Sequence, residues 1–172
     1  MSLSLYDTGV GSYLRTINAL QTVMGKAEET AASGTLDLEQ TVEFRFRDDM
    51  LPFAFQIISV WHHSMGALEG MKAGLFQPPP QLSDVTWRRL TELLEEANVY
   101  LREQDKGAIN NLAGKDMLFK AGALELPFTT DSFLLSFSLP NFYFHATTTY
   151  TALRHLGVPL SKLDFLGLTP GN

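Results

Sequence analysis

The amino-acid sequence predicts an all-α fold, namely a four-helix bundle with a small hairpin or extended excursion before the last helix. Two observations predict this fold. Four long segments place apolar residues at the three- and four-residue spacing of an amphipathic helix, and one long connection before the fourth segment is typical of a bundle with a crossover. The 172 residues are enough to bury one hydrophobic core, so we expect a single domain over residues 1–172.

The first two helices are predicted from their apolar patterns. The first carries the stripe Val10, Tyr13, Leu14, Ile17, Leu20 and Met24, and the pattern stops at residues 31–34, Ala-Ala-Ser-Gly. The second is predicted over about residues 37–70 and is apolar on most sides after Pro52. Because proline lacks an amide hydrogen, we expect Pro52 to kink this helix or to start a fresh turn near residues 49–51.

The third helix is predicted to follow a rigid linker of three prolines, residues 78–80. Ser83 and Asp84 are expected to form its N-cap. Its apolar stripe consists of Leu90, Leu93, Leu94, Ala97 and Leu101. After this helix, short runs with β-strand character flank residues 120–122, so residues 117–128 are predicted to form the hairpin or extended excursion.

The fourth helix is predicted from about Thr130 to Leu156, because Gly157 is suited to a C-cap and Pro159 prevents continuation. At 100° per residue, one face is apolar at both ends and polar in its middle. That face consists of Leu134, Phe137, Ser138, Asn141, His145, Thr148, Thr149, Ala152 and Leu156. Since a polar group buried without a partner costs about 1–3 kcal/mol, this belt is either a satisfied network or a functional site.

Composition excludes several classes of protein. The chain has no cysteine, which removes disulfide scaffolds, thiolate nucleophiles and cysteine-type zinc sites. Its 13 Lys and Arg against 19 Asp and Glu provide no basic surface for nucleic acid. No apolar run is long enough to span a bilayer and the N-terminus lacks the pattern of a signal peptide, so we expect a cytoplasmic protein without nucleic-acid or membrane partners.

Five segments resemble an uncharacterised family of DinB-like proteins, which carries a domain-of-unknown-function label within the DinB/YfiT-like superfamily. The segments are residues 2–7 (Ser-Leu-Ser-Leu-Tyr-Asp), Asp49 and Met50 followed by Gln56, residues 139–145 (Leu-Pro-Asn-Phe-Tyr-Phe-His), residues 153–158 (Leu-Arg-His-Leu-Gly-Val) and residues 162–167 (Lys-Leu-Asp-Phe-Leu-Gly). This resemblance covers essentially the whole chain. It implies a DinB-like four-helix bundle, often a homodimer, with a divalent metal held by three histidines.

The resemblance implies that one metal-binding histidine lies on the second helix and an HxxxH pair on the fourth. Counting back from Arg154 places His145 at the second histidine of the pair, Asn141 at the first and Thr148 at a glutamine of the pattern. The chain therefore has NxxxH, and the neutral amide oxygen of asparagine is a weak ligand for zinc or nickel. We expect a degenerate site without a bound metal.

Two residues of the second helix are candidates to face His145. Gln56 matches the pattern of the family, and His63 lies seven residues later, about 20° away on the helical wheel. Because this helix is apolar nearly all round, the sequence does not decide between them. For the adjacent pair His62 and His63, we expect one surface histidine and one partly buried histidine.

Three functions stay open at this point, and whether the chain is an enzyme is not decided. The first is a binding module whose degenerate metal site leaves a polar pocket for a small ligand, formed by Asn141, His145 and Gln56. The second is a metal-dependent enzyme, transferase- or hydrolase-like, that uses His145 with His63 or Gln56 and zinc or nickel. The third is a structural homodimer that binds no ligand.

Overall fold

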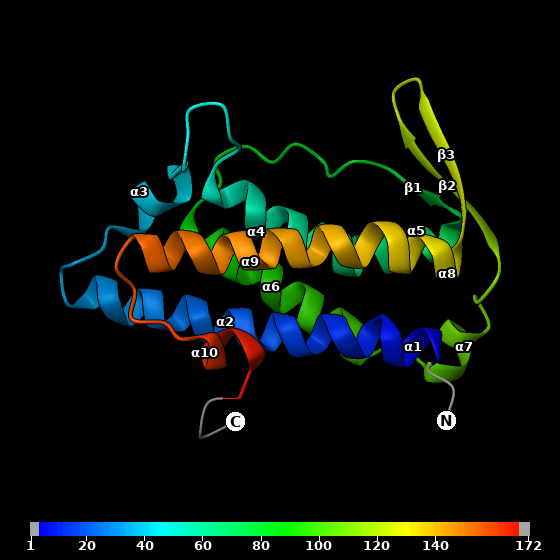
Figure 1. Cartoon of the computed structure of the whole chain (residues 1–172), viewed down its shortest axis with the longest axis horizontal. Coiled ribbons are helices and arrows are strands. Elements are labelled where there is room, and N and C mark those ends of the chain that lie inside the picture. The colour runs from blue at the N-terminus through cyan, green and yellow to red at the C-terminus, as the bar shows by residue number, and fades with distance from the viewer. Residues whose placement is uncertain (1–3, 169–172) are drawn as a thin grey trace.

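The long helices of the structure pack as a four-helix bundle, as predicted. The structure is a computed structural model that describes residues 4–168, so the first two residues of the segment 2–7 lie outside the described part. Helix α2 (Val10–Ala32) packs against α6 (Trp87–Arg102), and α4 (Phe53–Trp61) packs against both α6 and α9 (Leu139–His155) (Figure 1).

Shorter helices lie at the ends and edges of the bundle. They are α1 (Leu5–Thr8), α3 (Leu38–Glu43), α7 (Lys106–Asn110) and α10 (Lys162–Leu166). Helix α10 packs on α2, and α1 packs on α7 (Figure 1). Apolar side chains from all four long helices form a single buried cluster, in which Phe53 stacks on Trp87 with ring centroids 5.7 Å apart. Within residues 4–168, no helix combines the length and apolar character needed to cross a bilayer.

The second predicted helix starts afresh at Pro52, as expected from the proline, but residues 44–52 before it are not helical, so the predicted extent over residues 37–70 is wrong there. Helix α3 ends at Glu43, an irregular segment follows, and α4 begins only after Pro52, which is its N-cap at φ −68° and ψ 170°. The φ of −68° is the value that the proline ring itself fixes. From Phe53 the helix continues through a π-helical turn, η1 (His62–Gly66), and α5 (Ala67–Ala73), and it ends at left-handed Gly74.

The N-cap predicted for the third helix is also wrong. The cap is Thr86, whose hydroxyl accepts a hydrogen bond from the Arg89 amide at 3.2 Å. Asp84 instead has φ 54°, the left-handed conformation of a turn residue, which a short polar side chain tolerates.

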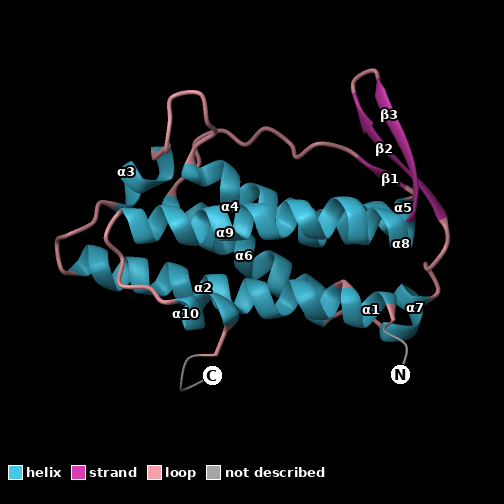
Figure 2. Cartoon of the chain, in the orientation of Figure 1, coloured by secondary structure: helices cyan, strands magenta, loops and turns pink. Residues whose placement is uncertain are grey.

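The predicted hairpin is confirmed and is part of a three-stranded sheet. Strands β2 (Asp116–Ala121) and β3 (Leu124–Thr129) pair antiparallel around Gly122, and they project from the helices as Figure 2 shows. A two-residue strand, β1 (Leu75–Phe76), pairs with β2 in parallel. This strand is too short to leave a periodic pattern in the sequence. It holds the Phe76 side chain against the bundle.

The fourth predicted helix is confirmed, with a widened turn inside it. It runs without a break through α8 (Thr130–Phe133), the π-helical turn η2 (Leu134–Ser138) and α9, and it stops before Gly157 at φ 94°. Pro140 accounts for the widening. Proline has no amide hydrogen for the carbonyl four residues earlier and its ring crowds that carbonyl, and a π turn relieves the crowding.

The π-helical turn changes which face of α9 points inward. The buried positions after the turn include Phe142, Ala146, Thr149 and Leu153. Phe142, Ala146 and Leu153 lie one residue beyond the predicted Asn141, His145 and Ala152, whereas Thr149 and Ala152 of the predicted face are themselves buried. One extra residue in a turn rotates the following helix by about 100° relative to an uninterrupted helix. The predicted inward face is therefore displaced, although His145 stays half-buried at its edge.

Replacing Gly70 with alanine is expected to destabilise the protein by about 1–3 kcal/mol, because α5 and β1 touch at this position. A Cβ atom at Gly70 would lie 3.0 Å from the Leu75 carbonyl oxygen and 3.1 Å from Phe76 Cβ. Gly25→Ala on α2 is the matched control. A Cβ at Gly25 meets nothing within 4 Å, so that variant should gain about 0.5–1 kcal/mol. Urea unfolding measures both, and equal effects would contradict the contact.

Candidate functional site

His145 of α9 is hydrogen-bonded across the helix seam to Gln56 of α4. His145 Nδ1 lies 2.8 Å from Gln56 Oε1, and the Gln56 amide nitrogen donates to the carbonyls of Leu51 and Pro52 at 3.4 Å each. Since the amide nitrogen is directed to those carbonyls, Oε1 is the acceptor for Nδ1–H. The neutral His145 ring therefore carries its hydrogen on Nδ1 and a lone pair on Nε2.

His63 of the η1 turn completes the cluster. Its ring lies nearly parallel to that of His145, with an interplanar angle of 16° and centroids 6.1 Å apart. The His63 side chain is 8% exposed, and its Nδ1 is fully shielded without a hydrogen-bond partner among the described residues. The sequence left open whether Gln56 or His63 faces His145, and in the structure both do. Gln56 is hydrogen-bonded to the His145 ring, and the His63 ring lies nearly parallel to it.

Both imidazoles of the cluster are neutral at pH 7. Burial, together with the neighbouring His62 and His145, lowers the pKa of His63 to about 3. Burial lowers the pKa of His145 to about 4. Removing an imidazolium from water disfavours its charged form, which is the direction seen in both shifts. The cluster therefore offers hydrogen bonds at neutral pH without a positive charge.

The expectation that one of His62 and His63 is a surface residue is wrong, since both are buried. The Phe76 ring of β1 covers them, at centroid distances of 4.5 Å from His62 and 5.5 Å from His63. Burial lowers the pKa of His62, whose Nε2–H donates to the Gln77 carbonyl at 2.7 Å. A two-residue strand thus buries a histidine that the helical wheel alone would leave in water.

Aromatic rings form the walls around the cluster. Phe55 and Phe144 meet the His145 ring edge to face, at centroid distances of 5.7 Å and 5.1 Å. Phe137 lies 5.9 Å from the His63 ring, next to Phe76. These apolar walls are the physical cause of the lowered pKa values, since they replace water around the nitrogens.

A buried chain of hydrogen bonds links the two π-helical turns. Ser138 Oγ of η2 donates its hydrogen to the His63 carbonyl of η1 at 2.7 Å. Because that hydrogen is used, the Tyr13 hydroxyl of α2, 2.7 Å from Ser138 Oγ, is the donor of the second hydrogen bond. Burial raises the pKa of Tyr13, and its hydroxyl stays protonated. This chain holds the His63 backbone against α9. The sequence had placed Tyr13 only among core residues, and nothing in its spacing pointed to this role.

Asn141 and Thr148 do not point into the cluster. The Asn141 Nδ2 donates to the Phe137 carbonyl at 2.7 Å, and Thr148 Oγ1 donates to the Phe144 carbonyl at 2.7 Å. Each side chain thus returns to the helix backbone four residues earlier. Asn141 lies one helical turn before His145 on α9, but its amide bonds to the backbone of its own helix and not to the His145 ring.

The residues of the cluster do not fit the divalent metal that the fold family implies. Among the described residues, no three His, Cys, Asp or Glu side chains converge on one point. The cluster supplies two imidazoles, and the Gln56 oxygen already accepts the His145 Nδ1–H. A catalytic zinc site uses three protein ligands, drawn from nitrogen, sulfur and carboxylate oxygen. Two imidazoles and one amide oxygen that is already hydrogen-bonded do not make up such a ligand set.

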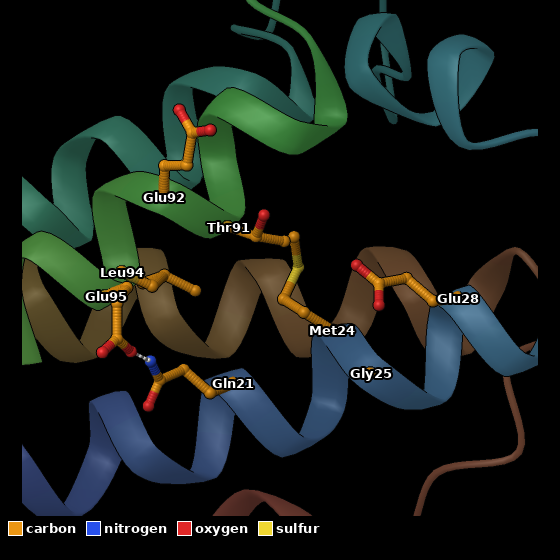
Figure 3. Close-up of a pocket in the computed structure, with 8 residues that line it drawn as sticks. All are labelled: Gln21, Met24, Gly25, Glu28, Thr91, Glu92, Leu94 and Glu95. Atoms are coloured by element: carbon orange, nitrogen blue, oxygen red, sulfur yellow. Dashed lines mark hydrogen bonds between the residues drawn. The ribbon is translucent and has the colours of Figure 1, made fainter.

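A separate hollow of about 390 Å³ lies between α2 and α6 (Figure 3). Its polar walls are already paired. Gln21 donates to Glu95 at 2.7 Å, Glu28 accepts from the Trp87 indole at 2.9 Å, and Glu92 pairs with Arg88 at 2.9 Å. Glu92 and Glu95 belong to the solvated face of α6, and Glu28 lies opposite them on α2. The hollow carries no unpaired group that points to a ligand.

Comparison with known proteins identifies both family and fold. The model of a domain of unknown function, DUF1993, matches residues 5–166. The crystal structure of a DinB family member from Shewanella denitrificans aligns with a TM-score of 0.79 over 98% of this chain and 94% of that one, at 24% sequence identity. No curated protein matches the chain in sequence. At this level of identity, the likeness to the solved structure shows a shared DinB-like fold.

Proposed function

Because the chain belongs to the family defined by the DUF1993 domain of unknown function, we propose a function from the geometry of the histidine cluster alone. The cluster is a binding site for a small neutral molecule with a planar apolar body and an O–H or N–H group. The metal centre that the fold family implies has degenerated in this chain.

One observation carries the proposal: His63 Nδ1 is shielded from solvent and has no hydrogen-bond partner among the described residues. Buried polar atoms in native proteins are nearly always bonded to protein, water or a ligand. The His145 Nε2 lone pair on the neighbouring ring accepts a hydrogen bond from the same bound group. Since both rings are neutral at pH 7, a neutral partner is favoured over an anion.

Phenol is a suitable probe for this site, since it is neutral, planar and carries one O–H. We expect saturable shifts of the ring ¹⁵N resonances of His145 and His63 on titration with phenol at pH 7.5, and no such shifts with toluene. His145→Ala should abolish the response. His155→Ala, at an exposed histidine of the same helix, is the matched control and should retain it. A response to toluene equal to that of phenol, or no saturation, would contradict the proposal.

The alternative function is a metal-dependent enzyme that uses His145. Protein purified without a histidine tag should take up less than stoichiometric zinc or nickel, measured by elemental analysis after dialysis against each ion. Stoichiometric metal that disappears in His145→Ala and persists in His155→Ala would overturn the degenerate site and favour the enzyme.

A homodimer is the second proposal. Support for it comes from apolar side chains on the outer side of α9, where Tyr143 and Phe144 are 38% and 62% exposed. Large apolar side chains that gather on a surface are typical of protein interfaces. Phe144 also forms one wall of the histidine cluster, but the dimer is tested separately, because the mass of the protein is measured without any ligand.

A further inference from the structure

The outer side of the fourth helix carries no charge over a long distance. Between Asp131 and Arg154 the sequence has no Lys, Arg, Asp or Glu. Three large apolar side chains of this stretch are exposed, namely Leu135 at 58%, Tyr143 at 38% and Phe144 at 62%. A solvated helix face normally alternates apolar and charged residues, so an uncharged face of this length indicates that something covers it.

The polar side chains of this face are satisfied within the helix. Thr148 Oγ1 donates to the Phe144 carbonyl at 2.7 Å, and Thr151 Oγ1 donates to the Thr147 carbonyl at 2.8 Å. Asn141 Nδ2 likewise donates to the Phe137 carbonyl. Because these donors point back to the backbone, the threonines present their methyl groups outward. The face is therefore more apolar than its sequence suggests.

A hollow of about 630 Å³ lies on the same face, beside Phe144. It is lined by Phe46, Met50, Pro140, Tyr143, Phe144, Thr147, Thr148 and Thr151. Phe46, from the irregular segment before α4, is 36% exposed and forms part of its rim. The face thus combines a projecting aromatic side chain with an apolar hollow next to it.

We propose that this surface, which we call the α9 face (Pro140, Tyr143, Phe144, Thr147 and Thr151, with Phe46 and Met50), meets the same face of a second copy of the chain. The inference rests on the proposed homodimer. In a two-fold interface the same patch must be complementary to itself. A projecting Phe144 beside an apolar hollow meets that condition, because the Phe144 of each copy enters the hollow of the other.

The charge distribution favours a second copy over a charged partner. Each chain has a net charge of −6, so two copies repel each other wherever acidic surfaces approach. The α9 face carries none of this charge along the helix. Two copies that meet there bury the exposed phenyl rings without opposing charges along α9, and the exposed charges beside Phe46 and Met50 are of both signs, namely Arg45, Arg47, Asp48 and Asp49.

Light scattering after size exclusion tests the face directly. We expect the wild-type chain at a mass near 38.2 kDa, twice the 19.1 kDa of one chain, and Phe144→Asp at 19.1 kDa. Leu163→Asp on α10, at a residue that is 51% exposed outside the face, is the matched control and should stay dimeric. Circular dichroism and thermal unfolding of Phe144→Asp confirm that the variant is folded.

A cysteine scan gives a second measurement, since the chain contains no cysteine. Under mild oxidation, Thr147→Cys or Thr151→Cys should form a disulfide-linked dimer, whereas Val99→Cys on exposed α6 should not. A wild-type monomer, or a monomer that binds phosphatidylcholine vesicles instead, would overturn both the homodimer and the α9 face. A wild-type dimer that persists in Phe144→Asp, without cross-linking at either threonine, would overturn the face alone.

Discussion

Lowering the pH from 7 to 4 is expected to destabilise the protein by about 6 kcal/mol through His63 and His145. Both are neutral when folded, because burial lowers their pKa values to about 3 and about 4. In the unfolded chain an imidazole has a pKa of about 6.5. Below that value the unfolded state binds protons that the folded state does not. The stability is therefore complete above about pH 6.5 and falls as the pH decreases toward 4.

Urea unfolding at pH 7, 6 and 5 measures this effect before most carboxylates titrate. His63→Leu should flatten the decline, because it removes the histidine with the lowest pKa, whereas Ser136→Ala, at an exposed position without a titratable group, should leave the slope unchanged. A free energy of unfolding that is constant between pH 7 and 5, or an unaltered slope in His63→Leu, would show that the buried imidazoles do not govern acid stability.

The sequence predicted the elements of this fold that depend on long apolar periods. The stripe from Val10, the leucines of α6 and the stop at Gly157 each have a local physical cause, so they are visible in one chain. Short elements that leave no periodic apolar pattern in the sequence were not predicted. Strand β1 has two residues, and its pairing with Leu118 and Phe119 comes from a hairpin about 40 positions away in sequence.

Helical periodicity also predicted part of the candidate site. Gln56 and His63 were correctly placed on one side of their helix, because a spacing of seven residues returns to nearly the same direction. Asn141 lies one turn before His145, as the NxxxH spacing requires, but a helical wheel does not show that its amide bonds to the Phe137 carbonyl. A proline near the start of a long helix is the sequence feature that, in retrospect, indicates the widened turn and the rotated face.

Ser138→Ala is expected to lower the free energy of unfolding by about 2–4 kcal/mol, because it leaves two buried groups without their hydrogen-bond partner. One is the Tyr13 hydroxyl, on a side chain with no exposed surface, and the other is the His63 carbonyl. Tyr13→Phe alone should cost about 1 kcal/mol, because Ser138 still donates to His63. Ser136→Ala, at an exposed serine of the same turn that bonds only to the Ser132 carbonyl, is the matched control and should cost less than either.

A double-mutant cycle separates this network from simple loss of packing. In Tyr13→Phe with Ser138→Ala, no tyrosine hydroxyl is left unpaired, so the double variant should cost about 1–2 kcal/mol less than the sum of the single variants. Additivity within about 0.5 kcal/mol would contradict the chain of hydrogen bonds. The ring ¹⁵N shifts of His63 give an independent measure. These shifts should change in Ser138→Ala and not in Ser136→Ala. Only Ser138 holds the His63 backbone against α9, and this contact fixes the position of the unpaired His63 Nδ1 beside His145.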